Sequence, residues 1–330
     1  MVETADYLCD RSTVDLLDDY LTGVRAHGAV FCNAVSCPPW GLRFTEPASL
    51  TLSAMLRGTA WLVPAEGEPV RMRQGDVALV RTAQPYTVAD HPGSPPHVLV
   101  DGQDRCALTG AQADSGRHWR LAGRTVDEMT ADGASDLLIT AGYRVGGELC
   151  GPLLDSLPTI AVIRPEEGVS PLLDLIAAEV EHDRPGQQVV LDRFLDLLLV
   201  RVLRSWFARP DSTPPTGYRA LADPDIGHVL RRLHEEPARP WTVASLADEA
   251  SMSRTAFARR FSALVGRPPL TYLTEWRMRL AADRLGAPGA TVTSVARSIG
   301  YTDAFAFSAA FKRVRGITPS AHRDRRARGL

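Results

Sequence analysis

Two segments near the end of the chain carry basic side chains at spacings that suit contact with a nucleic acid. Arg254, Thr255 and Arg259 fall on one side of a predicted helix, and Lys312 and Arg313 lie near the end of another. A guanidinium group can donate two hydrogen bonds to O6 and N7 of guanine, a contact that discriminates between bases by about 1–3 kcal/mol. Basic side chains also pair with phosphates regardless of base sequence. These residues therefore predict recognition of a duplex and not catalysis.

Each basic segment belongs to a predicted unit of two helices joined by a tight turn, at 251–252 in unit one and at 300–302 in unit two. Ser253 is the predicted N-cap of the second helix of unit one. A long helix connects the units, so the pattern is that of two helix-turn-helix motifs in tandem. The predicted helices are 243–250 and 253–264 in unit one, 270–285 in the connector, and 292–299 and 303–314 in unit two.

The second helix of each unit has one apolar face. Phe257 and Phe261, and likewise Phe307 and Phe311, are four residues apart and share a side of their helix. Burial of that side would leave the other free to enter the major groove. Arg259 is the predicted base reader, and unit two, with few polar groups, is expected mainly to hold the backbone. The predicted DNA contacts are Arg254, Thr255, Ala258, Arg259, Arg260, Ala304, Phe305, Ser308, Lys312 and Arg313.

The segment from about Ala220 to Arg328 resembles the AraC-type transcriptional regulators. The resemblance implies a sequence-specific regulator of double-stranded promoter DNA, and it favours an activator, which would contact RNA polymerase. The other interpretation is an all-helical interaction domain that touches no nucleic acid. The matching residues are Leu246, Ala247, Met252, Ser253, Phe257, Phe261, Gly266, Pro269, Tyr272, Leu273, Arg277 and Ala281 in unit one, and Ala296, Ile299, Gly300, Tyr301, Phe307, Phe311, Lys312, Arg313, Gly316, Thr318 and Pro319 in unit two.

Charge is distributed unevenly along the 330 residues, whose net charge is only -2. The part from Gly217 to Leu330 is basic and the remainder is acidic, which favours a C-terminal domain that binds phosphates. No apolar run approaches the ~20 residues of a membrane helix. The acidic N-terminus is unlike a signal peptide, so we expect a cytoplasmic location without membrane contact. No catalytic triad, phosphate loop or usable carboxylate pair occurs, so neither an enzyme nor a cofactor is expected.

Residues from about Val30 to Val162 read as short strands broken by Gly and Pro turns, which indicates a sandwich or small barrel. The run GDVALVRTAQPYTV resembles a cupin barrel. The later runs ITAGYRVGG and PLLDSLPTIAVI resemble the cupin-like sensor domain of an AraC-type subfamily that includes reactive-chlorine-sensing regulators. Metal-binding cupins use paired histidines and a glutamate, but Tyr86 stands where a histidine would be expected. No metal site is therefore predicted.

Two further helices are predicted at 171–182 and 187–207, and the second is apolar over more than one face. Such a helix must be covered on most sides, either by its own barrel alone or by the barrel and a second subunit. The resemblance to the AraC-type regulators implies that this region pairs two chains, so we expect a homodimer. The fold class is α+β, with an N-terminal cupin-like β-barrel and helical pair and a C-terminal all-α tandem helix-turn-helix domain. The predicted domains are 1–168 (sensor), 169–208 (helical pair, dimerisation), 209–218 (Pro-rich linker) and 219–330 (DNA binding).

The effector of the barrel has several interpretations. An oxidant could modify Cys32, Cys37 or Cys106 and reshape the barrel. A small organic ligand could be held by aromatic side chains, or the regulator could be controlled by its abundance alone. A different class of function is a small-molecule-binding cupin or cupin enzyme with an accessory nucleic-acid-binding domain. The candidate aromatic residues are Trp61, Tyr86, Trp40 and Phe44.

Overall fold

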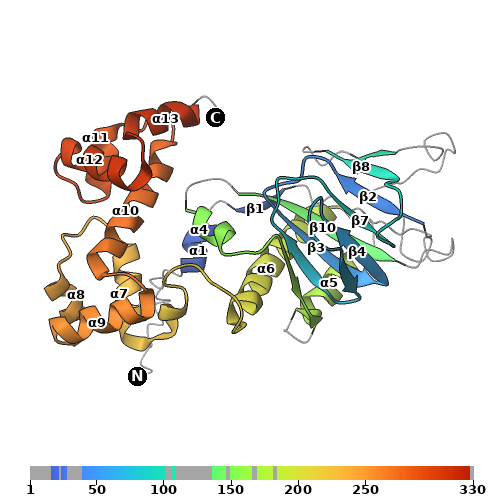
Figure 1. Ribbon diagram of the computed structural model, residues 1–330, viewed down its shortest axis with the longest axis horizontal. Helices are drawn as coiled ribbons and strands as arrows, with labels where there is room; N and C mark the ends of the chain where they lie inside the picture. The colour runs from blue at the N-terminus through green and yellow to red at the C-terminus, as the bar shows by residue number, and fades with distance from the viewer. Residues whose placement is uncertain are drawn as a thin grey trace, which may run out of the picture. The chain divides into compact units, whose positions relative to one another are not determined.

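The computed structural model describes residues 16–21, 24–27, 39–101, 106–108, 136–145, 149–165, 169–180 and 184–327 (Figure 1). The chain forms two compact units. The barrel unit comprises Gly23–Gly146 and Leu154–Thr213. The helical unit comprises Met1–Thr22, Gly147–Leu153 and Pro214–Leu330.

Two β-sheets face each other in the barrel unit. The five-stranded sheet has the order β1-β10-β3-β6-β11, and the six-stranded sheet has the order β5-β4-β7-β2-β8-β9. Neighbouring strands are antiparallel except for β2 and β8, which are parallel. The strands are β1 (Arg25–His27), β2 (Gly41–Phe44), β3 (Leu50–Arg57), β4 (Thr59–Val63), β5 (Val70–Arg73), β6 (Val77–Val80), β7 (Tyr86–Ala89), β8 (Val98–Val100), β9 (Cys106–Leu108), β10 (Leu137–Arg144) and β11 (Ile160–Ile163).

The space between the two sheets is filled by side chains. Met55 and Leu138 come from the five-stranded sheet, and Leu42, Leu62 and Val88 come from the six-stranded sheet. In strand β4, Ala60 and Leu62 face this core and are fully buried, while Thr59, Trp61 and Val63, which alternate with them, are only half-buried. This alternation is the period-two pattern of a strand with one covered face.

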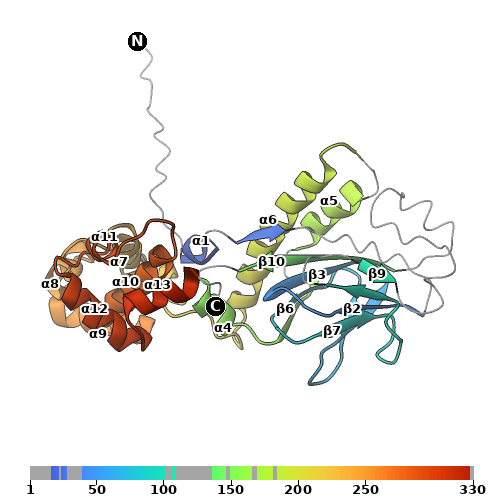
Figure 2. The ribbon, with the colours of Figure 1, turned by 90° about the horizontal axis from the view of Figure 1, so that it is seen from above.

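Helices α5 (Ser170–Val180) and α6 (Gln187–Ala208) lie against the other face of the five-stranded sheet (Figure 2). The Tyr143 hydroxyl of β10 donates to the carbonyl of Leu195 in α6 at 2.7 Å. Cover on both faces explains why all four residues of β6 are buried. The two predicted helices of this pair are confirmed at nearly the expected bounds.

The helical unit contains every helix that the sequence predicts for the tandem motif. The helices α7 before unit one and α13 after unit two were not predicted, nor were the short helices α1 and η2. Asp223 and Pro224 are the sequence signal of α7, since Asp is a good N-cap and Pro suits the first helical position. The elements of the helical unit are α1 (Leu16–Leu21), η2 (Arg219–Ala222), α7 (Pro224–Glu235), α8 (Val243–Glu249), α9 (Arg254–Val265), α10 (Pro269–Leu285), α11 (Val292–Ser298), α12 (Ala304–Arg315) and α13 (Pro319–Ala327).

The two units together confirm the predicted α+β fold class, with a β-rich N-terminal part and an all-helical C-terminal part. A short helix, α4 (Gly151–Asp155), lies between β10 and β11 in the chain. Over the described ranges, no helix has both the length and the apolar character needed to span a membrane.

Candidate nucleic-acid interface

Unit one begins with a reciprocal cap. The Ser245 N–H donates to Thr242 Oγ1 at 3.1 Å, and the Thr242 N–H donates to Ser245 Oγ at 3.0 Å, which starts helix α8. After the turn, Ser253 Oγ accepts the Ala256 N–H at 3.3 Å and starts α9, as the sequence predicts. The turn residue Ser251 has a φ of 52°, a left-handed conformation that is uncommon for a residue with a side chain.

Unit two repeats this construction. Thr291 and Ser294 form the same reciprocal cap at the start of α11, and the Asp303 carboxylate caps α12. The left-handed turn position is Gly300, with a φ of 88°. In both units a turn N–H returns to the first helix at 2.9 Å: Met252 to Ala247 in unit one and Tyr301 to Ala296 in unit two.

The apolar faces predicted for the second helices are buried. Phe257 and Phe261 are fully buried with ring centroids 5.6 Å apart, and so are Phe307 and Phe311 with the same separation. The first pair belongs to a core with α7, α8 and the start of α10, and the second to a core with the end of α10 and α11. Each helix-turn-helix unit therefore has its own core, and α10 contributes to both cores.

A strap formed by residues 237–239 connects helix-turn-helix unit one to helix-turn-helix unit two. The Arg277 guanidinium of α10 donates to the carbonyls of Pro237 at 2.6 Å and Arg239 at 2.8 Å. Burial lowers the pKa of Arg277, because the charged guanidinium is partly removed from water. Gly300 packs on the middle of the strap, since a Cβ there would lie 2.5 Å from the Ala238 carbonyl oxygen. The sequence resemblance marked Arg277 and Gly300 without giving this reason for them.

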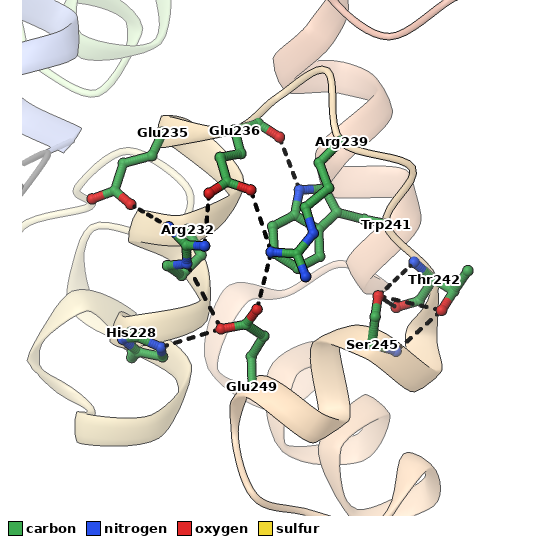
Figure 3. A network of polar contacts seen from close by, with 9 residues as sticks. All are labelled: His228, Arg232, Glu235, Glu236, Arg239, Trp241, Thr242, Ser245 and Glu249. Atoms are coloured by element: carbon green, nitrogen blue, oxygen red, sulfur yellow. Dashed lines mark hydrogen bonds and ion pairs between the residues drawn. The ribbon is translucent and has the colours of Figure 1, made fainter.

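A network of charged groups fixes α7 against α8 (Figure 3). Glu249 at the end of α8 lies 3.2 Å from Arg239, 3.7 Å from Arg232 and 3.6 Å from His228. Arg239 also stacks over the Trp241 ring at 4.0 Å. Arg232 further pairs with Glu235 and Glu236.

The outer face of α9 presents the predicted contacts of unit one. Arg254, Thr255 and Arg259 are exposed, and Ala258 between them is half-buried. Arg260 differs, because its guanidinium pairs with Asp223 at 2.7 Å and Asp225 at 3.0 Å at the start of α7. The structure thus brings Arg254, Thr255 and Arg259 together on an open face and places Arg260 in an intramolecular ion pair.

The outer face of α12 has a different chemistry. Phe305 is 86% exposed, and the Ser308 hydroxyl donates to the Ala304 carbonyl within the helix at 2.8 Å. Lys312 and Arg313 are exposed in the last turn, where Arg315 also lies. Side-chain donors that could bond to base edges are thus concentrated on α9. The cationic side chains of α12 lie at its C-terminal end.

Comparison with known proteins matches both parts of the chain. A cupin family matches residues 15–208, more than half of the chain, and a helix-turn-helix domain family matches residues 246–325. A putative AraC-like transcription regulator of Streptomyces lividans is 34% identical over 94% of this chain and 98% of its own length. Another from Streptomyces antibioticus is 31% identical with the same coverages. The RCS-specific HTH-type transcriptional activator RclR of Escherichia coli (strain K12) is 33% identical over 46% of this chain and 54% of its own length.

The chain belongs to the AraC-type family of transcriptional regulators. The predicted family and its cupin-like N-terminal domain are therefore confirmed. Relatives that match almost the full length carry regulator names, so this AraC-type protein is a DNA-binding regulator and not an enzyme.

The aromatic candidates for effector contact fall into two groups in this regulator. Phe44 and Tyr86 stack at 4.7 Å within the barrel core, and Trp40 donates from its indole to Asp136 at 3.0 Å. Trp61 lies on the face of β4 away from that core, with the Arg71 guanidinium 5.8 Å from its ring centroid. Trp61 and Tyr86 therefore do not lie on one common surface.

The cysteines proposed as redox groups are largely beyond what the structure describes. Cys32 and Cys37 lie outside the described residues, and of Cys106 only the backbone position in β9 is described. Cys150 is buried and its thiol donates to the Tyr20 carbonyl. Burial raises the pKa of the Cys150 thiol to about 11, so little reactive thiolate is present near neutral pH. Within the described residues, no three His, Cys, Asp or Glu side chains gather as metal ligands would.

Proposed function

We propose that this regulator reads base sequence mainly through α9 and holds the DNA backbone through the last turn of α12. The observation that supports this division is the exposed group of Arg254, Thr255 and Arg259 opposite the buried Phe257 and Phe261. Bidentate arginine contacts give sequence discrimination, whereas lysine and arginine contacts to phosphates give affinity and register. Of the remaining predicted contacts, Ala258, Ala304, Phe305 and Ser308 would face the two grooves, whereas the Arg260 guanidinium is held by Asp223 and Asp225.

We further propose that the protein acts as a homodimer through its helical pair, residues 169–208. Apolar side chains remain uncovered on this pair within the single chain: Leu175 on α5 is 54% exposed, and Val189 and Leu197 on α6 are 61% and 51% exposed. Burial of these side chains against a second copy would remove apolar surface from water. Analytical ultracentrifugation of Leu175→Asp/Leu197→Asp should give monomers where the unaltered chain gives dimers, and dimers from both would contradict this interface.

We propose activation of transcription in response to a small ligand or an oxidant sensed by residues 1–168. The relative RclR is named a transcriptional activator, which supports activation, and the cupin family matches residues 15–208, which supports a sensing role for this part. An activator bound to promoter DNA would contact RNA polymerase. It would act in the cytoplasm, the location expected from the sequence. In a reporter strain, deletion of the gene should lower expression from its target promoter. Raised expression would instead indicate a repressor.

Fluorescence anisotropy on the DNA upstream of the gene tests the sensing proposal. The full-length protein, reduced or mildly oxidised, is compared with the fragment Gly217–Leu330. If oxidation changes the DNA affinity of the full-length protein but not that of the fragment, the thiols would be supported as the sensor. If both proteins bind and neither responds to oxidation, the oxidant is excluded and the barrel is screened for a small ligand. Absence of sequence-selective binding by either protein would contradict the role of α9 and α12.

A further inference from the structure

Helix α12 exposes a large aromatic side chain in its first turn. Phe305 has the highest exposure of any large hydrophobic side chain in the described part of the chain. Phe307 and Phe311 on the same helix are fully buried, so Phe305 lies on the side away from the core. Exposed aromatic surface is unfavourable in water, and it gains free energy when a partner covers it.

The repeat of the two units shows what Phe305 replaces. When Phe257 is matched to Phe307, Phe261 to Phe311 and Gly266 to Gly316, the residue matched to Phe305 is Thr255. On the same register Ala304 replaces Arg254 and Ala309 replaces Arg259. Helix α12 therefore carries methyl and phenyl groups where α9 carries its hydrogen-bond donors.

Charge separates the two ends of α12. The Asp303 carboxylate accepts the N–H groups of Phe305 at 2.9 Å and Ala306 at 3.2 Å, so the start of the helix carries a negative group and its amides are occupied. Lys312, Arg313 and Arg315 lie in the last turn. Phosphates would be repelled at the first end and attracted at the second. The first turn is thus suited to base edges and the last turn to the backbone.

The major groove offers one apolar group to such a surface, the C5 methyl of thymine. The first residues of a recognition helix are those that contact base edges. Alanine and phenylalanine can cover the methyl group without needing a hydrogen-bond partner. Ser308 adds little competing polarity, because its hydroxyl already donates to the Ala304 carbonyl.

We propose that Phe305 is a specificity-determining residue that covers a thymine methyl group in the half-site bound by unit two. This proposal rests on the proposed DNA-binding roles of α9 and α12. It adds thymine recognition to a helix whose cations hold the backbone, and it requires no hydrogen bond from the side chain.

Single replacement of thymine by deoxyuridine tests the proposal, since it removes only the methyl group. The full-length protein first selects its site from random duplexes, and each thymine of that site is then replaced in turn. We expect one or two positions where the affinity falls about 4-fold, the value for one buried methyl-sized group. Phe305→Ala should bind the thymine duplex more weakly and no longer distinguish thymine from uracil at those positions. Phe305→Leu should keep part of the difference.

Val314→Ala is the matched control, because Val314 is a partly exposed apolar residue of the same helix that lies outside the predicted contacts. It should retain the full thymine preference. The proposal is overturned if the unaltered protein selects a site but binds every uracil duplex equally, or if Phe305→Ala keeps the preference. Undiminished DNA affinity of Phe305→Ala would instead assign the ring to a protein partner. If the unaltered protein selects no site at all, the DNA-binding roles proposed for α9 and α12 fail first.

Discussion

At the scale of single residues, the two recognition helices use the same anchors and different outer faces. The paired phenylalanines fix how far each helix stands out from its core. Arg254 and Arg259 then give α9 directional donors, while α12 has Lys312 and Arg313 at its end. Arginine and lysine differ here, since the planar guanidinium can make two parallel hydrogen bonds and the ammonium is a point charge.

Arg259→Ala should relax base preference at one or two positions of the site. The loss expected is about 1–3 kcal/mol of discrimination, the value of one bidentate arginine contact to guanine. Binding of the variant to a panel of single-base-pair changes measures it. Arg43→Ala removes an exposed arginine from strand β2 of the barrel unit and serves as control. An unchanged preference in Arg259→Ala would exclude it as a base reader.

Lys312→Ala should weaken binding to all sequences about equally and reduce the slope of log affinity against log salt by about one. Lys312→Arg keeps the charge and should keep the slope. Lys312 is also the only lysine in the sequence, so amine-reactive labelling reports on this side chain and the N-terminus alone. A loss confined to particular base sequences would contradict a phosphate contact.

At the scale of elements, the turn of each helix-turn-helix unit contains a residue with left-handed backbone conformation. The left-handed position is Ser251 in unit one and Gly300 in unit two. Only Gly300 is also pressed against another segment, the strap at Ala238. The need for glycine in unit two therefore has two causes, conformation and space.

Gly300→Ala should destabilise the helical unit more than Gly266→Ala. Both positions have positive φ, but a Cβ at Gly266 would have open space around it. We expect about 1–2 kcal/mol at Gly266 from backbone conformation, and a further ~1–3 kcal/mol at Gly300 from overpacking. Urea denaturation followed by the helical circular dichroism signal compares them. Equal losses of unfolding free energy in the two variants would mean that the strap shifts to accommodate a Cβ at position 300 without an energetic penalty.

The sequence was sufficient for the elements whose signals are local. The cap at Ser253 and the paired phenylalanines located the helices almost to the residue. Contacts between distant segments could not be predicted in this way: Arg260 pairs with Asp223, and Arg277 holds the strap, across long stretches of chain. Such pairs leave no periodic pattern, since they depend on how helices pack and not on the order of residues within one helix.

At the scale of the whole molecule, residues 219–330 contain the cores of both helix-turn-helix units, which supports the proposal that this segment is a domain. Its two cores are formed largely from residues after Ala220, and α10 contributes to both. The segment before it, from Pro210 to Gly217, is rich in proline and belongs to no helix or strand. The boundaries proposed above, at 208 and 218, follow from this composition.

The fragment 217–330 should therefore fold alone and bind one site, with lower affinity than the full-length protein if that protein is the proposed dimer. Circular dichroism and anisotropy on the selected duplex check both parts. A fragment that includes the linker, from Pro210, is the matched control for the cut position. An unfolded 217–330 beside a folded longer fragment would place the boundary earlier in the chain.

The strap held by Arg277 and Gly300 also bears on how promoters can change. Because the strap joins α9 and α12 into one block, the proposed reading of DNA by both helices would fix the distance between the two half-sites of one subunit. One inserted base pair would turn one half-site by about 35° relative to the other, since a duplex turn holds about 10–10.5 base pairs. Base substitutions inside a half-site would then be tolerated step by step, whereas single insertions or deletions between half-sites would abolish regulation at once. Promoters controlled by this regulator should consequently diverge in base sequence while keeping the spacing between their half-sites.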